Sequence, residues 1–120
     1  MDGYYRLEAY EVPVHTRLAA HRFAKSAARE LGIEVPRVTW WRSSGGVWHG
    51  WVEVDELNIN LVLDKLYDLG QIKSATYHEI RHLWQYATGR YLSPGADDRD
   101  ATHWAYQMTN VMPLRLMKGE

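Results

Sequence analysis

The sequence predicts a single α+β domain that spans residues 1–120, with an N-terminal helix, a small three-stranded antiparallel sheet and two C-terminal helices. Two observations carry this prediction, one of periodicity and one of composition. Apolar residues recur every three or four positions in residues 16–31, 72–88 and 97–112, as they do in helices with one buried face. Residues 38–62 instead contain short segments rich in Val, Ile and Trp, which are typical of strands.

The composition is that of one folded domain and excludes several functions. The 120 residues are 46% hydrophobic and include six Trp and eight Tyr, which is enough for a single core and unlike a disordered chain. The net charge of −1, without a run of like charges, argues against nucleic-acid binding as the main function. Because there is no cysteine, disulfides and Cys-type zinc sites are impossible.

The N-terminal residues 1–12 are polar and mixed in charge, unlike a signal peptide, and no apolar run is long enough to cross a bilayer. We therefore expect a cytoplasmic protein without a membrane segment.

The first elements are an extended segment and a helix. Residues 4–14 are rich in Tyr and Val, and we expect a strand or an extended arm there. Residues 16–31 form the predicted helix, with Thr16 as its N-cap and Gly32 as its stop. Its apolar stripe consists of Leu18, Ala19, Phe23, Ala27 and Leu31.

A meander of three antiparallel strands is expected over residues 38–62. Residues 38–42 form its first strand. The Gly-Gly pair in residues 43–46 predicts a tight turn, because glycine adopts positive φ at little cost, and residues 47–54 form the returning strand.

The third strand of this meander follows a turn at Asp55 and Glu56. Residues 57–62 alternate apolar with polar side chains, which predicts a half-buried strand. We interpret the tryptophans of this region as the core and rim of the sheet rather than as a ligand platform; they are Trp40, Trp41, Trp48 and Trp51.

Two helices complete the chain. After a connector with a short helical turn, residues 72–88 form a helix that ends at Gly89. The Ser-Pro-Gly sequence of residues 93–95 predicts a turn, and residues 97–112 form the second helix. A last turn is expected in residues 114–117.

The predicted helix 72–88 contains the pattern H-E-x-x-H, formed by His78, Glu79 and His82. On a helix, the two histidines lie one turn apart on the same face, so both imidazoles can reach one metal ion. Glu79 can reach a water on that metal without being a ligand. The pattern therefore predicts a zinc hydrolase site with Glu79 as general base.

A catalytic zinc usually has three protein ligands, so one more is needed. The downstream candidates are Asp97, Asp98, Asp100 and His103. Acidic residues at a helix start also have an ordinary explanation, because they cap free N–H groups and stabilise the helix dipole. The residue pattern alone leaves the choice among the four open.

The H-E-x-x-H motif and the acid-x-x-Ala stretch that follows it in the chain (residues 98–101) resemble the motifs of the gluzincin metallopeptidases. In those enzymes, a Glu from a following helix completes the metal site. Residues 101–105, Ala-Thr-His-Trp-Ala, are similar to the stretch after that ligand in ImmA/IrrE-like peptidases, and the layout of residues 16–112 resembles the minimal gluzincins. The resemblance implies a zincin-like fold, a bound Zn²⁺ and Asp98 as the third ligand beside His78 and His82. The chain departs from the family in having Asp at this position, one methylene shorter than Glu.

We therefore expect a zinc-dependent metallopeptidase that hydrolyses peptide or protein substrates, held extended along one edge of the 38–62 sheet. Candidate donors for the oxyanion are Tyr106, His103, Tyr91 and Arg81.

The alternative is a latent or inactive zinc-binding domain, a precursor or interaction module whose cleft is closed by residues 1–14, residues 113–120 or a partner chain. A plain interaction module with incidental histidines is a third hypothesis. The aromatic content also suits a homodimer.

Overall fold

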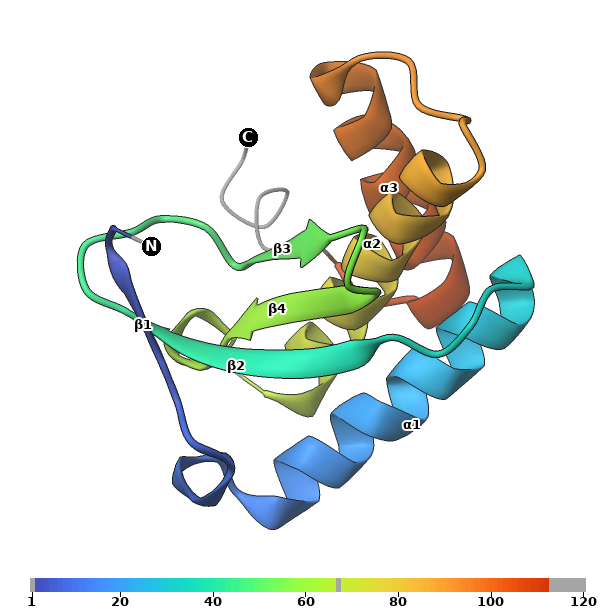
Figure 1. Ribbon diagram of the computed structural model, residues 1–120. Coiled ribbons are helices and arrows are strands. Elements are labelled where there is room, and N and C mark those ends of the chain that lie inside the picture. Colours follow the sequence, from blue (N-terminus) through green and yellow to red (C-terminus); the bar gives the residue numbers. More distant parts are fainter. Residues whose placement is uncertain (1, 67, 113–120) are drawn as a thin grey trace.

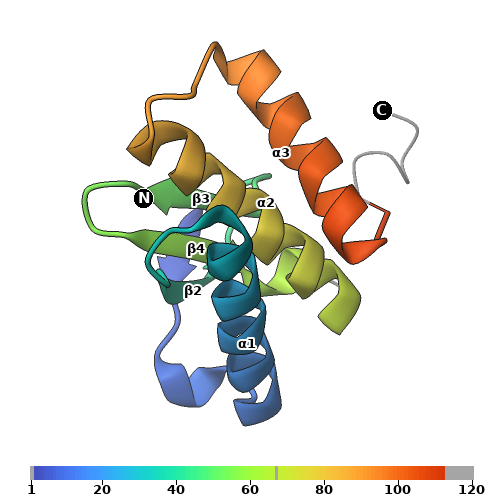
Figure 2. The ribbon, with the colours of Figure 1, turned by 90° about the vertical axis from the view of Figure 1, so that its right-hand side faces the viewer.

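The computed structural model describes residues 2–66 and 68–112, in which three α-helices and a four-stranded mixed sheet form an α+β fold. Figure 1 shows the sheet beside helices α1 (Val14–Leu31) and α2 (Leu69–Ala87). Helix α3 (Pro94–Thr109) packs on α2 near one edge of the sheet, as the rotated view in Figure 2 makes clear. The α+β class is as predicted.

The predicted antiparallel meander is wrong, because the sheet has the order β1-β2-β4-β3. Strand β2 (Arg37–Ser43) pairs in parallel with β4 (Asn58–Val62), whereas β3 (Gly50–Glu53) pairs antiparallel with β4 at the edge. Strand β1 (Tyr4–Arg6) pairs antiparallel with β2 at the opposite edge, so the N-terminal arm adds a strand.

The Gly-Gly pair does not form a hairpin turn, and the reason lies in its packing. A side chain on Gly46 would lie 2.1 Å from the ring of Tyr4, and the amide of Gly46 donates a hydrogen bond to the carbonyl of Gly3 (3.1 Å). These glycines let the loop pass closely over the N-terminal arm on its way to the far edge of the sheet.

The hairpin between β3 and β4 is close to the prediction, with the turn at residues 54–57. All five residues of β4 are buried, so the prediction of a half-buried strand is wrong. Asn58 and Asn60, on one face of β4, bond to side chains of both neighbouring strands, which removes them from solvent without leaving polar groups unpaired. A fully buried strand belongs in the centre of a sheet.

Helix α1 begins at Val14 after Pro13, earlier than the predicted Thr16, and ends at Gly32 in the left-handed conformation (φ 69°) as predicted. The predicted stripe is wrong at Leu18, which is 55% exposed. The buried face consists mainly of alanines: Ala19, Ala20, Ala24, Ala27 and Ala28. Small residues let α1 approach α2 closely.

The C-terminal helices start earlier than predicted because of their N-caps. The 3₁₀ turn η2 (Leu63–Lys65) precedes α2, whose first turn is capped by the side chain of Asp68. The predicted turn at residues 93–95 is instead the start of α3, with Ser93 as N-cap and Pro94 at the first helical position. The last turn expected in residues 114–117 lies outside the described residues.

Candidate functional site

Helix α2 places the two motif histidines on one face, as the spacing requires. His78 and His82 are largely buried, and their Nε2 atoms are 3.1 Å apart. Their rings meet edge to face with centroids 4.7 Å apart.

Helix α3 brings Asp98 to this pair. Asp98 Oδ1 lies 3.2 Å from His78 Nε2 and 3.8 Å from His82 Nε2. One ligand atom from each of the three residues lies within 4.8 Å of the others. Ligand atoms placed tetrahedrally around a zinc ion are about 3.4 Å apart, which follows from zinc–ligand bonds of about 2.1 Å. Two imidazole nitrogens and one carboxylate oxygen therefore stand at separations that one zinc ion fits.

The other candidates for the third ligand have different contacts. Asp97 is buried and accepts a hydrogen bond from the amide of Leu92 (2.8 Å), which fixes the loop before α3. Asp100 pairs with Arg81, whose hydrogen bonds hold the pKa of the Asp100 carboxyl below its usual value. His103 is exposed and is not part of the cluster.

Glu79 lies beside the histidines and is 7% exposed. Burial raises the pKa of its carboxyl above the usual range, and the two imidazoles oppose this rise only in part. The carboxylate packs against Gly50 at the start of β3, where an added Cβ would lie 3.1 Å from Glu79 Oε2. A carboxylate whose pKa is raised is a stronger base, which suits proton transfer.

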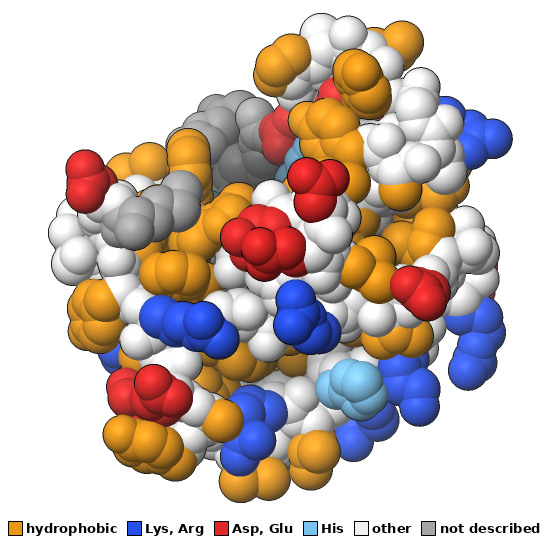
Figure 3. Space-filling view, in the orientation of Figure 1, with side chains coloured by type: hydrophobic (Ala, Val, Ile, Leu, Met, Phe, Trp, Pro, Cys, Tyr) orange, Lys and Arg blue, Asp and Glu red, His pale blue; other side chains and the backbone are white. Residues whose placement is uncertain are grey.

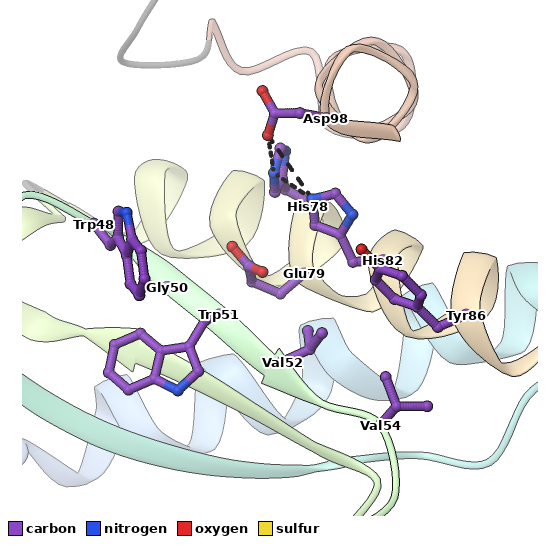
Figure 4. A pocket seen from close by; sticks show the side chains of 10 residues that line it. All are labelled: Trp48, Gly50, Trp51, Val52, Val54, His78, Glu79, His82, Tyr86 and Asp98. Atoms are coloured by element: carbon purple, nitrogen blue, oxygen red, sulfur yellow. Dashed lines mark hydrogen bonds and ion pairs between the residues drawn. The ribbon is translucent and has the colours of Figure 1, made fainter. Parts of the chain in front are cut away.

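These residues lie in a cleft of about 550 Å³ between β3, α2 and α3 (Figure 4). In Figure 3, acidic and histidine side chains are visible together in the hollow beneath α3. The lining residues are Trp48, Gly50, Trp51, Val52, Val54, His78, Glu79, His82, Tyr86 and Asp98. The cleft thus combines one polar cluster with apolar and aromatic walls, as ligand sites commonly do.

The second nitrogen of each histidine has a polar neighbour. Gln85 Oε1 is 2.8 Å from His82 Nδ1, and Thr102 Oγ1 is 3.4 Å from His78 Nδ1. Partners of this kind orient metal-binding imidazoles. Sequence reasoning missed both, although Gln85 follows His82 by three positions and Thr102 follows Asp98 by four, which are helix-face spacings.

The four predicted oxyanion donors do not line the cleft. Arg81 bonds to Asp100, and the ring of Tyr91 packs at a tilt against that of Tyr86 (centroids 5.3 Å apart, interplanar angle 36°). Tyr86 lines the cleft in their place, with its hydroxyl toward the middle of the cleft (Figure 4). The signal for it was present in the sequence, because Tyr86 continues the series of His78 and His82 at steps of four.

The tryptophans differ in environment. Trp40 is buried in the core, as predicted. Trp41 and Trp51 pack on each other, with centroids 5.2 Å apart. Trp48 is 52% exposed at the rim of the sheet and, with Trp51, forms one wall of the cleft.

Comparisons with models of protein families, with characterised proteins and with solved structures found no match to this chain. Among the helices of the described residues, none has the length and apolar character needed to span a membrane.

Proposed function

We propose that the protein is a zinc-dependent peptidase whose metal ligands are His78, His82 and Asp98. The observation that carries this proposal is the cluster of one atom from each of these residues within 4.8 Å, beside the buried Glu79 and open to a cleft. Two imidazoles and a carboxylate form a donor set that catalytic zinc sites use, with a fourth position left for water or substrate.

The chemistry divides between the metal and Glu79. Bound zinc would supply an activated water and polarise the scissile carbonyl. Glu79 accepts the proton of the attacking water at a carboxylate oxygen and delivers it to the leaving amine as the C–N bond breaks. Each cycle consumes one water and yields a carboxylate and an amine.

The substrate class follows from the strand that borders the cleft. Among the residues that the structure describes, strand β3 pairs only with β4, and its other side is the edge of the sheet. An extended peptide can add to such an edge through main-chain hydrogen bonds, with its side chains alternating between the two faces. Trp48, Trp51 and Tyr86 line the cleft, so we propose peptides with apolar or aromatic side chains as substrates.

The decisive experiment measures metal content by mass spectrometry and cleavage of a peptide library for the wild type and three variants. His78→Ala should lose both zinc and cleavage. Glu79→Gln should keep zinc and lose cleavage, because the ligands remain but the base does not. His103→Ala removes an exposed histidine of α3 and should keep both. Full zinc content in His78→Ala would overturn the proposed centre.

The alternative function, an inactive zinc-binding domain, shares the metal centre and differs only in cleavage. Strand β1 and the 3₁₀ turn η1 (Ala9–Glu11) belong to the N-terminal arm, and none of residues 2–14 lines the cleft. Wild-type protein that contains zinc and cleaves no peptide would favour this alternative.

A further inference from the structure

Three polar side chains, Arg81, Gln85 and Asp100, join α2 to α3 behind the candidate metal centre; we refer to them as the helix clamp. Gln85 is its central member and is 1% exposed. Its Nε2 donates to Asp100 Oδ2 (2.8 Å) and to the carbonyl oxygen of Asp97 (3.0 Å), and its Oε1 lies 2.8 Å from His82 Nδ1. Both ends of this buried amide are therefore occupied.

This arrangement determines which nitrogen of His82 carries the proton. A carbonyl oxygen and a carboxylate oxygen can only accept, so the NH₂ group of Gln85 must face Asp97 and Asp100. The amide oxygen then faces His82, and because it can only accept, Nδ1 of His82 must be protonated. In the neutral ring Nε2 is left with its lone pair, and Nε2 is the atom that faces His78 and Asp98.

Arg81 holds the far end of the clamp. Its Nε and Nη2 donate to Asp100 Oδ2 (2.7 Å) and Oδ1 (3.1 Å). Its guanidinium also lies over the rings of Trp84 (4.1 Å) and Trp104 (5.3 Å). A two-point hydrogen bond and two aromatic surfaces leave the carboxylate of Asp100 little freedom to turn away from Gln85.

The clamp also contacts α3 at residues on both sides of Asp98 in the sequence. Gln85 contacts the carbonyl of Asp97 and the side chain of Asp100, on either side of Asp98 along the first turns of α3. The side chain of an aspartate is one methylene shorter than that of a glutamate, so α3 must lie close to α2 if Asp98 is to reach the histidines. Asp98 Oδ1 is already 3.2 Å from His78 Nε2.

We propose that the helix clamp is a positioning device for the metal centre: it fixes His82 with its proton on Nδ1 and holds α3 close enough for the short Asp98 to serve as a ligand. The inference rests on the proposed metal centre but not on peptidase activity. Gln85, Asp100 and Arg81 are positioning residues, since none of them lines the cleft.

The first test reads the tautomer of His82 in metal-free protein by long-range ¹H–¹⁵N NMR, at a pH where imidazole is neutral. The wild type should show His82 protonated on Nδ1. Gln85→Met, which keeps the length of the side chain but not its hydrogen bonds, should lose this preference. Protonation of wild-type His82 on Nε2 would overturn the proposal.

The second test measures zinc affinity by competition with a chelator. Gln85→Met should weaken zinc binding about 10- to 100-fold, the usual effect of removing such an outer partner. Asp100→Asn should have a smaller effect, because its amide oxygen can still accept from Gln85. Thr76→Val is the control, since Thr76 is a fully buried residue of α2 whose hydroxyl bonds to the carbonyl of Ile72 (2.7 Å).

Equal zinc affinity in the wild type and Gln85→Met, or an equal loss in Thr76→Val, would overturn the positioning role. Neither measurement uses cleavage. A protein that binds zinc in a Gln85-dependent way and cleaves nothing would therefore support the clamp while refuting the peptidase function.

Discussion

At the scale of single residues, Tyr86 has the clearest consequence for the proposed chemistry. It lies one turn beyond His82, with ring centroids 6.5 Å apart, and lines the cleft. A phenolic hydroxyl can donate a hydrogen bond to the oxyanion that forms as the peptide carbonyl is attacked. Tyr86→Phe should therefore lower kcat about 100-fold with little change in KM, as measured by steady-state peptide cleavage.

The matched control for this prediction is Tyr91→Phe. Tyr91 packs against the ring of Tyr86 but is not among the lining residues, so removal of its hydroxyl should leave kcat unchanged. If both variants lost activity equally, the hydroxyl of Tyr86 would have no specific role.

Glu53 is expected to make stability depend on pH. Hydrogen bonds from the amides of Asn60 and Asn58 hold the pKa of its carboxyl below the usual value. A carboxyl whose pKa is lower in the folded than in the unfolded chain stabilises the fold above its unfolded pKa, and this contribution disappears as the pH falls through its folded pKa. Glu53→Gln should thus lower Tm near neutral pH, and the difference from the wild type should shrink below about pH 4.

Melting curves of both proteins at a series of pH values test this expectation. Glu56→Gln removes a carboxylate from the same hairpin and controls for the change in net charge. A Tm difference for Glu53→Gln that stays constant down to acid pH would contradict the prediction.

The sequence predicted the local part of the candidate site well and the distant part poorly. His78, Glu79 and His82 belong to one helix, so their spacing alone places them together. Each residue step turns the side chain by about 100° around α3, so Asp97, Asp98 and Asp100 point in different directions, and only the packing of α3 on α2 decides which one faces the histidines. The resemblance to the gluzincins indicated Asp98, which the structure places beside them.

At the scale of elements, Gly50 shows how closely β3 approaches α2. A Cβ at this position would lie 2.6 Å from the carbonyl oxygen of Asn60 and 3.1 Å from Glu79 Oε2. Gly50→Ala should therefore force the hairpin or Glu79 to move and destabilise the protein by about 1–3 kcal/mol in chemical denaturation.

Gly95→Ala provides the comparison. Among the described residues, its Cβ would meet only the side chain of Arg99, at 3.6 Å, within α3. The free energy of unfolding should stay the same or rise by up to about 1 kcal/mol, because alanine restricts the unfolded chain. A similar loss in both variants would show that the tight contact at Gly50 does not matter.

The positions of helices and strands in the sequence were easier to predict than the order in which the strands pair. Periodicity found the helices and most strands, because it reflects which face of each element is buried. It does not encode strand order, so the Gly-Gly loop was interpreted as a hairpin turn although it carries the chain to the far edge of the sheet. Ser93 and Pro94 were assigned to a turn for a related reason, since Ser-Pro occurs both in turns and at helix starts.

At the scale of the whole molecule, the metal would act as a cross-link between α2 and α3. A ligand that binds only the folded protein stabilises it by about 2.7 kcal/mol at a concentration 100 times Kd. For a domain of this size, that raises Tm on the order of 10 °C. Zinc should therefore raise Tm in differential scanning calorimetry, and a chelator should reverse the change.

Asp98→Ala tests whether this stabilisation needs both helices. The variant keeps the two histidines of α2 but lacks the acidic group of α3, so zinc should change its Tm far less. An equal rise in the variant would place the metal elsewhere.

The position of Asp98, the proposed third ligand, on α3 also affects when the proposed centre would be completed during synthesis. Both histidines leave the ribosome before Asp98, because α2 precedes α3 in the chain. The hairpin of β3 and β4 is local and can form early, whereas the docking of α3 on α2 must wait for the residues that follow Pro94. We therefore expect a nascent chain to carry a two-histidine half-site without hydrolytic power. Under the proposed peptidase function, its own unfolded segments and those of neighbouring chains would then be safe from cleavage until α3 has docked.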